Sequence, residues 1–213
     1  MRNIVKGVEP MSLIQYRATR NPDPNYQGYA DKDTLRAHLV SEQRGLCCYC
    51  LSRIRAEREA MKIEHWHSQA AHGAEQLDYS NLLGACLGNE GKPRGDQHCD
   101  TRQGDRDLSR NPANPLHRVE DVVRFSGDGE ISSVDPVFDA ELNDVLNLNL
   151  PFLKNNRKSM LTAFQDGLAK RGPLRRAALE RWLREWNGES EDGALRPYCQ
   201  VVVFWLRKRL ARP

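Results

Sequence analysis

Four cysteines in two pairs are the first residues in this sequence whose types and spacing could do chemistry. Cys47 and Cys50 form a C-x-x-C pair, and Cys86 and Cys99 follow further along the chain. Two cysteine pairs can enclose a tetrahedral zinc ion, with Zn–S bonds of about 2.3 Å. Such a site has no open coordination position. We therefore expect a structural zinc ion that holds loops together and takes no part in a reaction.

A second set of polar residues lies between these pairs, in the stretch "IEHWHSQ" and shortly after it. Glu64 and His65 are adjacent, and Asn81 precedes the third cysteine. Carboxylate and amide oxygens suit Mg²⁺ or Mn²⁺, and a neutral imidazole beside them can deprotonate a water molecule. One metal ion and one general base are enough to hydrolyse a phosphodiester. If a later carboxylate or amide completes the metal site, this set predicts a hydrolytic centre separate from the zinc.

The composition of the whole chain is that of a folded protein without membrane segments. Of 213 residues, 39% are hydrophobic and 29% charged, and the formal net charge is +3. These values favour one domain, with or without an appendage, and only weakly suggest a polyanionic partner. No apolar run approaches the roughly 18 residues of a membrane span, and the start lacks the apolar core of a secretory signal. We therefore expect a cytoplasmic protein, in which cysteines favour metal binding over disulfides. Cys48 and Cys199 are left as core or bystander residues, and Cys48 could exchange with Cys47 as a zinc ligand because it lies between two of the candidate ligands in sequence.

An arm and a helix are expected before the first cysteine pair. Residues 1–33 are rich in turn formers and predict an extended N-terminal arm. Asp31 or Asp33 can cap a helix from Thr34 to about Arg44, and Gly45 would end it. The C-x-x-C pair would then be presented at the end of this helix.

The central segment predicts short elements joined by loops. The stretch "MKIEHWHSQ" predicts a strand that enters a loop, and "LDYSNLLGAC" predicts a turn followed by a short helix or a helical turn. Residues 87–98 are rich in glycine and polar residues without apolar periodicity, which is typical of a loop. The stretch "VEDVVRFSGDGEISSV" predicts a β-hairpin around its "GDG" turn.

Three helices are expected in the last third of the chain. Pro151 lies in the first turn of the first helix, and Asn149 would cap it. The second helix runs from Pro173 to Asn187 and the third from Pro197 to Leu210. The expected regions are an N-terminal arm at 1–33, a central domain at 34–135 and a C-terminal helical region at 136–213.

The order of these motifs resembles that of the HNH endonucleases, which have the ββα-metal fold. The C-x-x-C pair is followed by "IEH", then by "YSNLLGAC" and then by "HCD". The opening "MRNIVKGVEP", the stretch "LRAHLVSEQRGLCCYC", the segment "VLNLNLPFLKNNR" and the overall length are similar to the HNH-nuclease subunit of Septu-type and retron-associated antiphage systems (PtuB-like proteins). The resemblance implies an α+β fold, with a zinc-stapled ββα-metal nuclease core and a C-terminal α-helical region.

The resemblance also implies a role for each residue that matches the motif. His65 would be the general base, and Asn81 would support the base and the catalytic loop. Glu64 and Asp100 would hold the catalytic Mg²⁺ or Mn²⁺. The structural zinc ligands would be Cys47, Cys50, Cys86 and Cys99. The cleavage products would carry 5′-phosphate and 3′-hydroxyl ends.

Partners follow from the same resemblance. The substrate would be DNA or RNA. An ABC/SMC-like ATPase subunit (PtuA-like) would act with the nuclease, and in retron-associated systems a reverse transcriptase with its msDNA would join them. The C-terminal helices, which mix apolar and aromatic residues, are the expected docking surface.

The third metal-site residue departs from the common HNH pattern. That pattern closes with a compact C-x-x-C-N, whereas here an insert separates the last two cysteines and Asp100 follows the second one. Aspartate can ligate Mg²⁺. His98 or Asn89 could replace Asp100 as the ligand.

Other residues keep more than one interpretation. His67 would share a strand face with His65, and it could bind metal or phosphate or be a surface imidazole. Asn81 could cap the helical turn that follows it. A non-catalytic zinc-ribbon-like nucleic-acid-binding module, or an assembly subunit, would not need Glu64 or His65. The complete ordered set makes a metal-dependent HNH endonuclease the leading hypothesis.

Overall fold

The protein has a mixed α+β fold, as expected from the sequence. The computed structural model describes residues 1–19, 24–170, 175–189 and 193–212. The α-helices are α1 (Met11–Ala18), α2 (Lys32–Glu42), α3 (Cys99–Gln103), α4 (Val119–Val122), α5 (Pro136–Ala140), α6 (Pro151–Ala169), α7 (Arg176–Asn187) and α8 (Cys199–Leu210). The strands are β1 (Lys62–His65), β2 (Leu82–Ala85), β3 (Val123–Phe125) and β4 (Ile131–Ser133). Short 3₁₀ turns occupy Gly73–Glu75, Tyr79–Asn81 and Arg94–Asp96, and a π-helical turn occupies Glu141–Val145.

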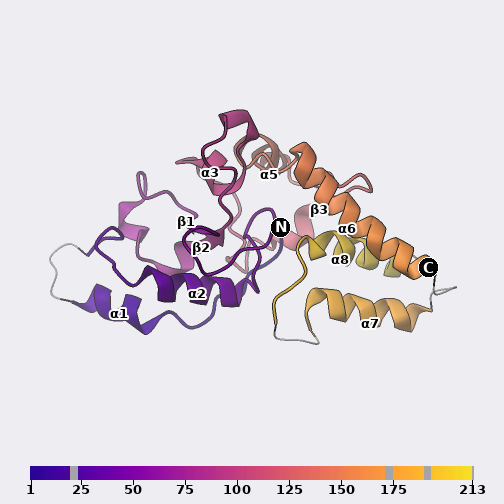
Figure 1. Ribbon diagram of the computed structural model, residues 1–213, viewed down its shortest axis with the longest axis horizontal. Helices are drawn as coiled ribbons and strands as arrows, with labels where there is room; N and C mark the ends of the chain where they lie inside the picture. Colours follow the sequence, from indigo (N-terminus) through magenta and orange to yellow (C-terminus); the bar gives the residue numbers. More distant parts are fainter. Residues whose placement is uncertain (20–23, 171–174, 190–192, 213) are drawn as a thin grey trace.

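The molecule is elongated, with its elements in two halves (Figure 1). The helices α1 and α2 and the β1–β2 hairpin lie toward one end, and α6, α7 and α8 lie toward the other. The amino terminus lies between the halves, and α3 and α5 lie above it in this view. No helix in the described ranges is both long enough and apolar enough to cross a membrane.

The N-terminal segment is not the extended arm expected from its turn-forming residues. Met11–Ala18 forms α1 directly after Pro10. Leu13 of this helix is fully buried and packs in one apolar cluster with Leu35 and Leu39 of α2. The side chain of Met1 is also buried, in the cluster that contains the cysteines. Burial of these apolar side chains stabilises the observed local structure. The prediction of an extended arm was wrong because it considered the turn formers alone.

The helix before the first cysteine pair is present, with one of the two expected caps. Oδ1 of Asp31 accepts a hydrogen bond from the Thr34 N–H at 3.3 Å, so Asp31 is the cap. The helix ends at Glu42, two residues earlier than expected, because Arg44 and Gly45 have positive φ angles of 53° and 75°. Left-handed residues of this kind end helices.

The segment after the Tyr79–Asn81 turn forms a strand, and the expected short helix is absent. β2 pairs antiparallel with β1, so that Glu64 lies opposite Leu83 and His65 opposite Leu82. All four residues of β2 are buried. Gln43 covers the outer edge of β2, since its side chain accepts from the Gly84 N–H at 2.6 Å and donates to the Gly84 carbonyl at 2.7 Å. A short run buried on both faces suits a strand as well as a helix, which explains the wrong prediction.

The predicted β3–β4 hairpin and C-terminal helices are present, with different ends. β3 and β4 pair antiparallel, and α6 begins at Pro151 as expected. Asn149 does not cap α6; its side chain bonds instead to the N–H and the carbonyl of Ile131, at 2.9 and 2.8 Å. α8 begins two residues later than predicted because Tyr198 has a φ of 57°. Residues 173 and 174, the expected start of the second helix, lie outside the described residues.

The C-terminal helices pack against the loop that carries the first cysteine pair. Leu46 and Leu51 of that loop share a buried cluster with Trp182, Trp186 and other residues of α6–α8. The Tyr198 N–H donates to the Leu51 carbonyl at 3.0 Å. Each Å² of apolar surface buried in this cluster stabilises the protein by roughly 25 cal/mol. This shared burial couples the helices to the cysteine loop.

Candidate metal centres and active site

The sulfur atoms of the two predicted cysteine pairs meet in one buried cluster. The Sγ atoms of Cys47, Cys50, Cys86 and Cys99 all lie within 4.8 Å of one another. The Cys47–Cys99 distance is 3.9 Å and the Cys50–Cys86 distance is 3.7 Å. Two Zn–S bonds of about 2.3 Å at a tetrahedral angle place their sulfurs about 3.8 Å apart. The four cysteines thus have the donor type and spacing of a structural zinc site.

Three separate elements bring these cysteines together. The first pair lies in the turn after α2, where the Leu51 N–H bonds to the Cys47 carbonyl at 3.2 Å. Cys86 directly follows β2, and Cys99 is the first residue of α3. Burial raises the pKa of Cys47, but hydrogen bonds from the other thiols outweigh it and lower this pKa well below its usual value. The neighbouring thiols and burial raise the pKa of Cys86 and of Cys99 well above the usual value, so the cluster carries fewer than four thiolates until a cation binds.

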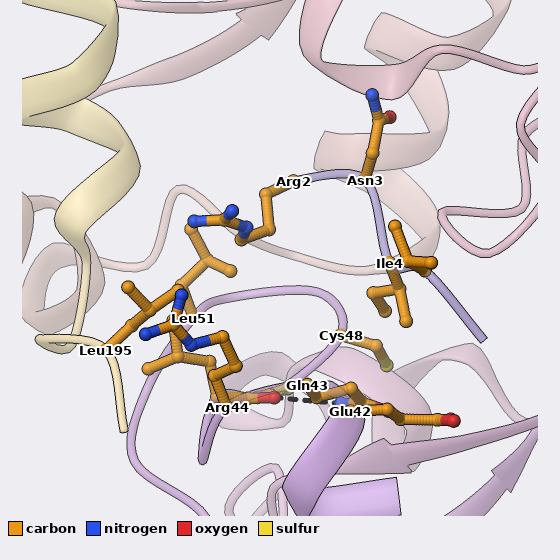
Figure 2. Close-up of a pocket in the computed structure, with 12 residues that line it drawn as sticks. Arg2, Asn3, Ile4, Glu42, Gln43, Arg44, Cys48, Leu51 and Leu195 are labelled. Carbon is orange, nitrogen blue, oxygen red and sulfur yellow. Dashed lines mark hydrogen bonds between the residues drawn. The ribbon is translucent and has the colours of Figure 1, made fainter. Parts of the chain in front are cut away.

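Cys48 is buried but lies outside the cluster. Its Sγ is not in the group of four. Figure 2 shows Cys48 beside Ile4 in a cavity of about 150 Å³ that Arg2, Arg44 and Leu195 also line. Neither Glu64 nor His65 lines this cavity. Cys48 is therefore a core residue next to the cluster, as expected, and exchange of ligands with Cys47 has no geometric support.

Glu64 is a buried carboxylate whose orientation is fixed by the cysteine loop. Its residue exposure is 3%, and Oε1 accepts a hydrogen bond from the Tyr49 hydroxyl at 2.8 Å. Burial raises the pKa of Glu64 well above its usual value, and the negative charge of Asp100 raises it further. A buried carboxylate facing a second carboxylate is costly without a cation. This pair therefore fits a divalent metal ion.

Asp100 faces Glu64 from α3 and has a lysine as its neighbour. Lys62 Nζ lies 3.5 Å from Asp100 Oδ2 and 2.9 Å from Glu90 Oε1. The groups of three or more close ligand side chains found among the described residues do not include Glu64 and Asp100. Glu64 and Asp100 would therefore supply two carboxylate ligands, without a third protein side chain from those groups. The remaining ligands would be water and substrate phosphate, which is usual for Mg²⁺.

The imidazole of His65 is held by hydrogen bonds at both ring nitrogens. Nε2 lies 3.0 Å from the Gln76 carbonyl oxygen, which can only accept, so Nε2 carries the proton. Nδ1 is then the basic nitrogen, and it accepts from Gln69 Nε2 at 3.3 Å. Burial lowers the pKa of His65 below 6.5, although its bond to Gln76 acts in the opposite direction. The ring of Tyr26 packs edge-on against the imidazole at 4.5 Å. A neutral, oriented imidazole can act as a general base.

Asn81 fixes the loop between His67 and Glu75 and does not touch the His65 ring. Its Oδ1 accepts from the His67 N–H at 2.7 Å. Its Nδ2 donates to the carbonyls of His67 and Glu75, at 3.1 and 3.3 Å. Asp78, rather than Asn81, accepts the capping bond of the 3₁₀ turn, from the Ser80 N–H. Asn81 therefore holds the backbone of the loop that ends next to Gln76, the residue whose carbonyl bonds to His65.

The alternative ligands His98 and Asn89 bond to other groups in this structure. His98 Nδ1 is 3.1 Å from Cys99 Sγ, so His98 belongs to the surroundings of the cysteine cluster. Asn89 has a φ of 60° and donates to the Asp96 carbonyl at 2.8 Å, which closes the insert loop. His67 follows the end of β1, so the shared strand face with His65 is not formed.

Four contributors to this arrangement were not singled out from the sequence. They are Tyr49, Lys62, Gln69 and the backbone carbonyl of Gln76. Tyr49 had a local signal, since it stands between two metal-ligand candidates in "CCYC". The Gln76 carbonyl had none, because every residue has a carbonyl and only the folded loop directs this one toward His65.

One known protein resembles the chain along most of its length. It is an Escherichia coli protein named "Retron Ec83 putative HNH endonuclease", which is 26% identical over 233 aligned residues. The alignment covers 88% of this chain and 88% of the relative. This likeness supports an HNH endonuclease at the level of the family and links that family to a retron. No protein-family model matches the chain.

Proposed function

We propose that the chain is a metal-dependent HNH endonuclease that hydrolyses phosphodiester bonds of nucleic acid. In this proposal β1, β2 and α3 form the ββα-metal core, and the four clustered cysteines bind a structural zinc ion. The observation that carries the proposal is the environment of His65. A neutral imidazole with an unprotonated Nδ1 lies directly after a buried carboxylate, Glu64, that faces Asp100.

The roles of these residues follow from their positions. His65 Nδ1 takes a proton from a water molecule, whose oxygen attacks phosphorus as the bond to the 3′-oxygen breaks. Glu64 and Asp100 would hold a Mg²⁺ or Mn²⁺ ion, which supplies positive charge for the leaving oxygen when bound. Asn81 and the Gln76 carbonyl keep the imidazole in this orientation. The products would carry 5′-phosphate and 3′-hydroxyl ends.

We further propose that the nuclease is the effector of an antiphage defence system and acts with an ATPase subunit. The retron in the relative's name supports this placement. The docking surface would lie on α6 and α7, where a groove of about 560 Å³ is lined by Phe164, Trp186, Arg181 and Glu185. Deletion of the C-terminal helices would also uncover Leu46 of the cysteine loop. The exchange Arg181→Glu therefore tests docking more cleanly, by loss of co-purification with the ATPase.

The activity is tested with purified protein on plasmid DNA and on total RNA, with Mg²⁺, with Mn²⁺ and with EDTA. The expected result is metal-dependent cleavage of one nucleic acid, with products that a ligase can rejoin without prior phosphorylation. Absence of metal-dependent cleavage both alone and with the ATPase subunit would contradict the proposal. Nucleic-acid binding without cleavage would then favour a non-catalytic zinc-ribbon-like module.

A further inference from the structure

Two imidazoles and a carboxylate gather in the loop that follows His65. His67, His72 and Glu75 each offer a ligand atom, and these atoms lie within 4.8 Å of one another. The His67 and His72 rings stack with centroids 4.3 Å apart and planes 20° apart. His67 Nδ1 shares a hydrogen bond with Glu75 Oε2 at 2.7 Å. We propose that these three side chains form a further metal site, for Zn²⁺ or a similar transition-metal ion.

The donor set selects the class of ion. Imidazole nitrogen together with one carboxylate suits zinc and its neighbours, whereas Mg²⁺ prefers an all-oxygen shell. Asp107 Oδ2 lies 3.2 Å from His72 Nε2. A carboxylate on the outer nitrogen of a histidine fixes the ring and leaves the other nitrogen for the metal, as in many zinc sites. His72 would accordingly bind through Nδ1, with Asp107 behind it.

Only a small movement is needed to admit the ion. Zinc bonds of about 2.1 Å at a tetrahedral angle separate two ligand atoms by about 3.4 Å. The His67–Glu75 contact of 2.7 Å would lengthen to that value as the ion replaces the shared proton. The side chains of His67 and Glu75 are 28% and 42% exposed, so both can move and the ion can reach them from solvent. A water molecule would complete the coordination.

The backbone that carries these ligands is already fixed. Asn81 bonds to the N–H and carbonyl of His67 and to the carbonyl of Glu75. The His72 N–H donates to the Ser68 carbonyl at 2.8 Å. A site whose ligands are held before binding loses less entropy when the ion arrives. These bonds therefore favour a specific site over a chance grouping of surface histidines.

The position of the site gives the ion a role. Glu75 directly precedes Gln76, whose carbonyl accepts a hydrogen bond from the Nε2–H group of His65. An ion that joins His67 to Glu75 would hold the two ends of this loop and stabilise the orientation of the imidazole. This consequence for cleavage rests on the proposed function. The binding of the ion does not.

The site is tested by zinc content after dialysis of the full chain against micromolar Zn²⁺, measured by mass spectrometry. Wild type should retain one more equivalent of zinc than either His72→Gln or Glu75→Gln. The Glu75→Gln change keeps the backbone carbonyl to which Asn81 donates. His38→Gln, a change on α2 outside the group, should retain the wild-type content. Circular dichroism and retention of the cysteine-bound zinc show that each variant is folded.

Equal zinc content in wild type and in both loop variants would overturn the proposal. So would the same loss in His38→Gln, since it would indicate unspecific surface binding. The measurement is repeated on His65→Ala, where the extra equivalent should remain. An extra equivalent in a protein that cuts no nucleic acid would uphold this site while the proposed function fails.

Discussion

The hydroxyl of Tyr49 donates a 2.8 Å hydrogen bond to Oε1 of Glu64. Tyr49 lies between two cysteines of the sulfur cluster, and Glu64 is the candidate ligand of the catalytic ion. One side chain thus connects the two candidate metal centres. The cysteine loop therefore does more than stabilise the fold in this account, because Tyr49 also orients the Glu64 carboxylate in the candidate active site.

Loss of this hydroxyl should weaken catalytic metal binding. Substitutions behind a metal ligand commonly reduce metal affinity or activity by about 10- to 100-fold. Tyr49→Phe should therefore raise the Mg²⁺ concentration for half-maximal cleavage by about tenfold or more, with unchanged zinc content. Tyr79→Phe is the matched control, since the Tyr79 hydroxyl donates to Glu42 at the same distance of 2.8 Å. A Mg²⁺ requirement that changes equally in both variants would remove Tyr49 from the active site.

Asn81→Ala should destabilise the protein and slow cleavage. The change deletes three bonds to the loop and leaves the part-buried His67 N–H without its partner. An unsatisfied buried group costs about 1–3 kcal/mol. We expect the free energy of unfolding, measured with urea, to fall by about 2 kcal/mol. Asn156→Ala, on the exposed side of α6, should change it by less than about 0.5 kcal/mol. A capping role alone would leave cleavage by folded Asn81→Ala unaffected.

Removal of one clustered sulfur should remove the zinc. Cys86→Ser should lose bound zinc and about 3 kcal/mol or more of stability, because structural zinc contributes directly to folding. Zinc content by mass spectrometry and thermal unfolding measure the two effects. Cys48→Ser is the control, since Cys48 is a buried cysteine outside the cluster. Retained zinc in Cys86→Ser, or its loss in Cys48→Ser, would reassign the ligands.

The ion pair between Glu120 and Arg207 should make stability depend on pH. Burial alone would raise the pKa of Glu120, but the 2.8 Å bond from Arg207 and the charge of Arg2 lower it on balance below 4.5. A carboxyl with a lowered folded-state pKa contributes stability above its unfolded-state pKa, and the contribution disappears as pH falls through the folded-state value. The difference in unfolding free energy between wild type and Glu120→Gln should therefore be largest near neutral pH and shrink below about pH 4.5.

The exposed pair on α7 supplies the comparison for this pH series. Glu180 accepts from Arg176 four residues earlier, and both side chains are largely exposed. Surface pairs of this kind contribute little, so Glu180→Gln should show no comparable difference at any pH. A wild-type advantage over Glu120→Gln that grows as the solution is acidified would contradict the assignment.

The predictable features were those set by local patterns. The spacing of the cysteines, the Asp31 cap and Pro151 at the start of α6 depend on neighbouring residues, and the structure has all of them. β2 was not predicted as a strand, because a four-residue buried run carries no periodicity. The contacts of Tyr49 with Glu64 and of Gln76 with His65 join residues 11 to 15 positions apart. Only the folded loops bring them together.

The central claim is that His65 Nδ1 is the general base of a metal-dependent nuclease. The most direct test compares the cleavage rates of wild type, His65→Ala and the control His38→Ala, at equal zinc content and equal Mg²⁺ or Mn²⁺. Loss of a general base should slow cleavage by about 10²- to 10⁴-fold. The account predicts such a loss for His65→Ala and a wild-type rate for His38→Ala. A near wild-type rate for folded His65→Ala would contradict it.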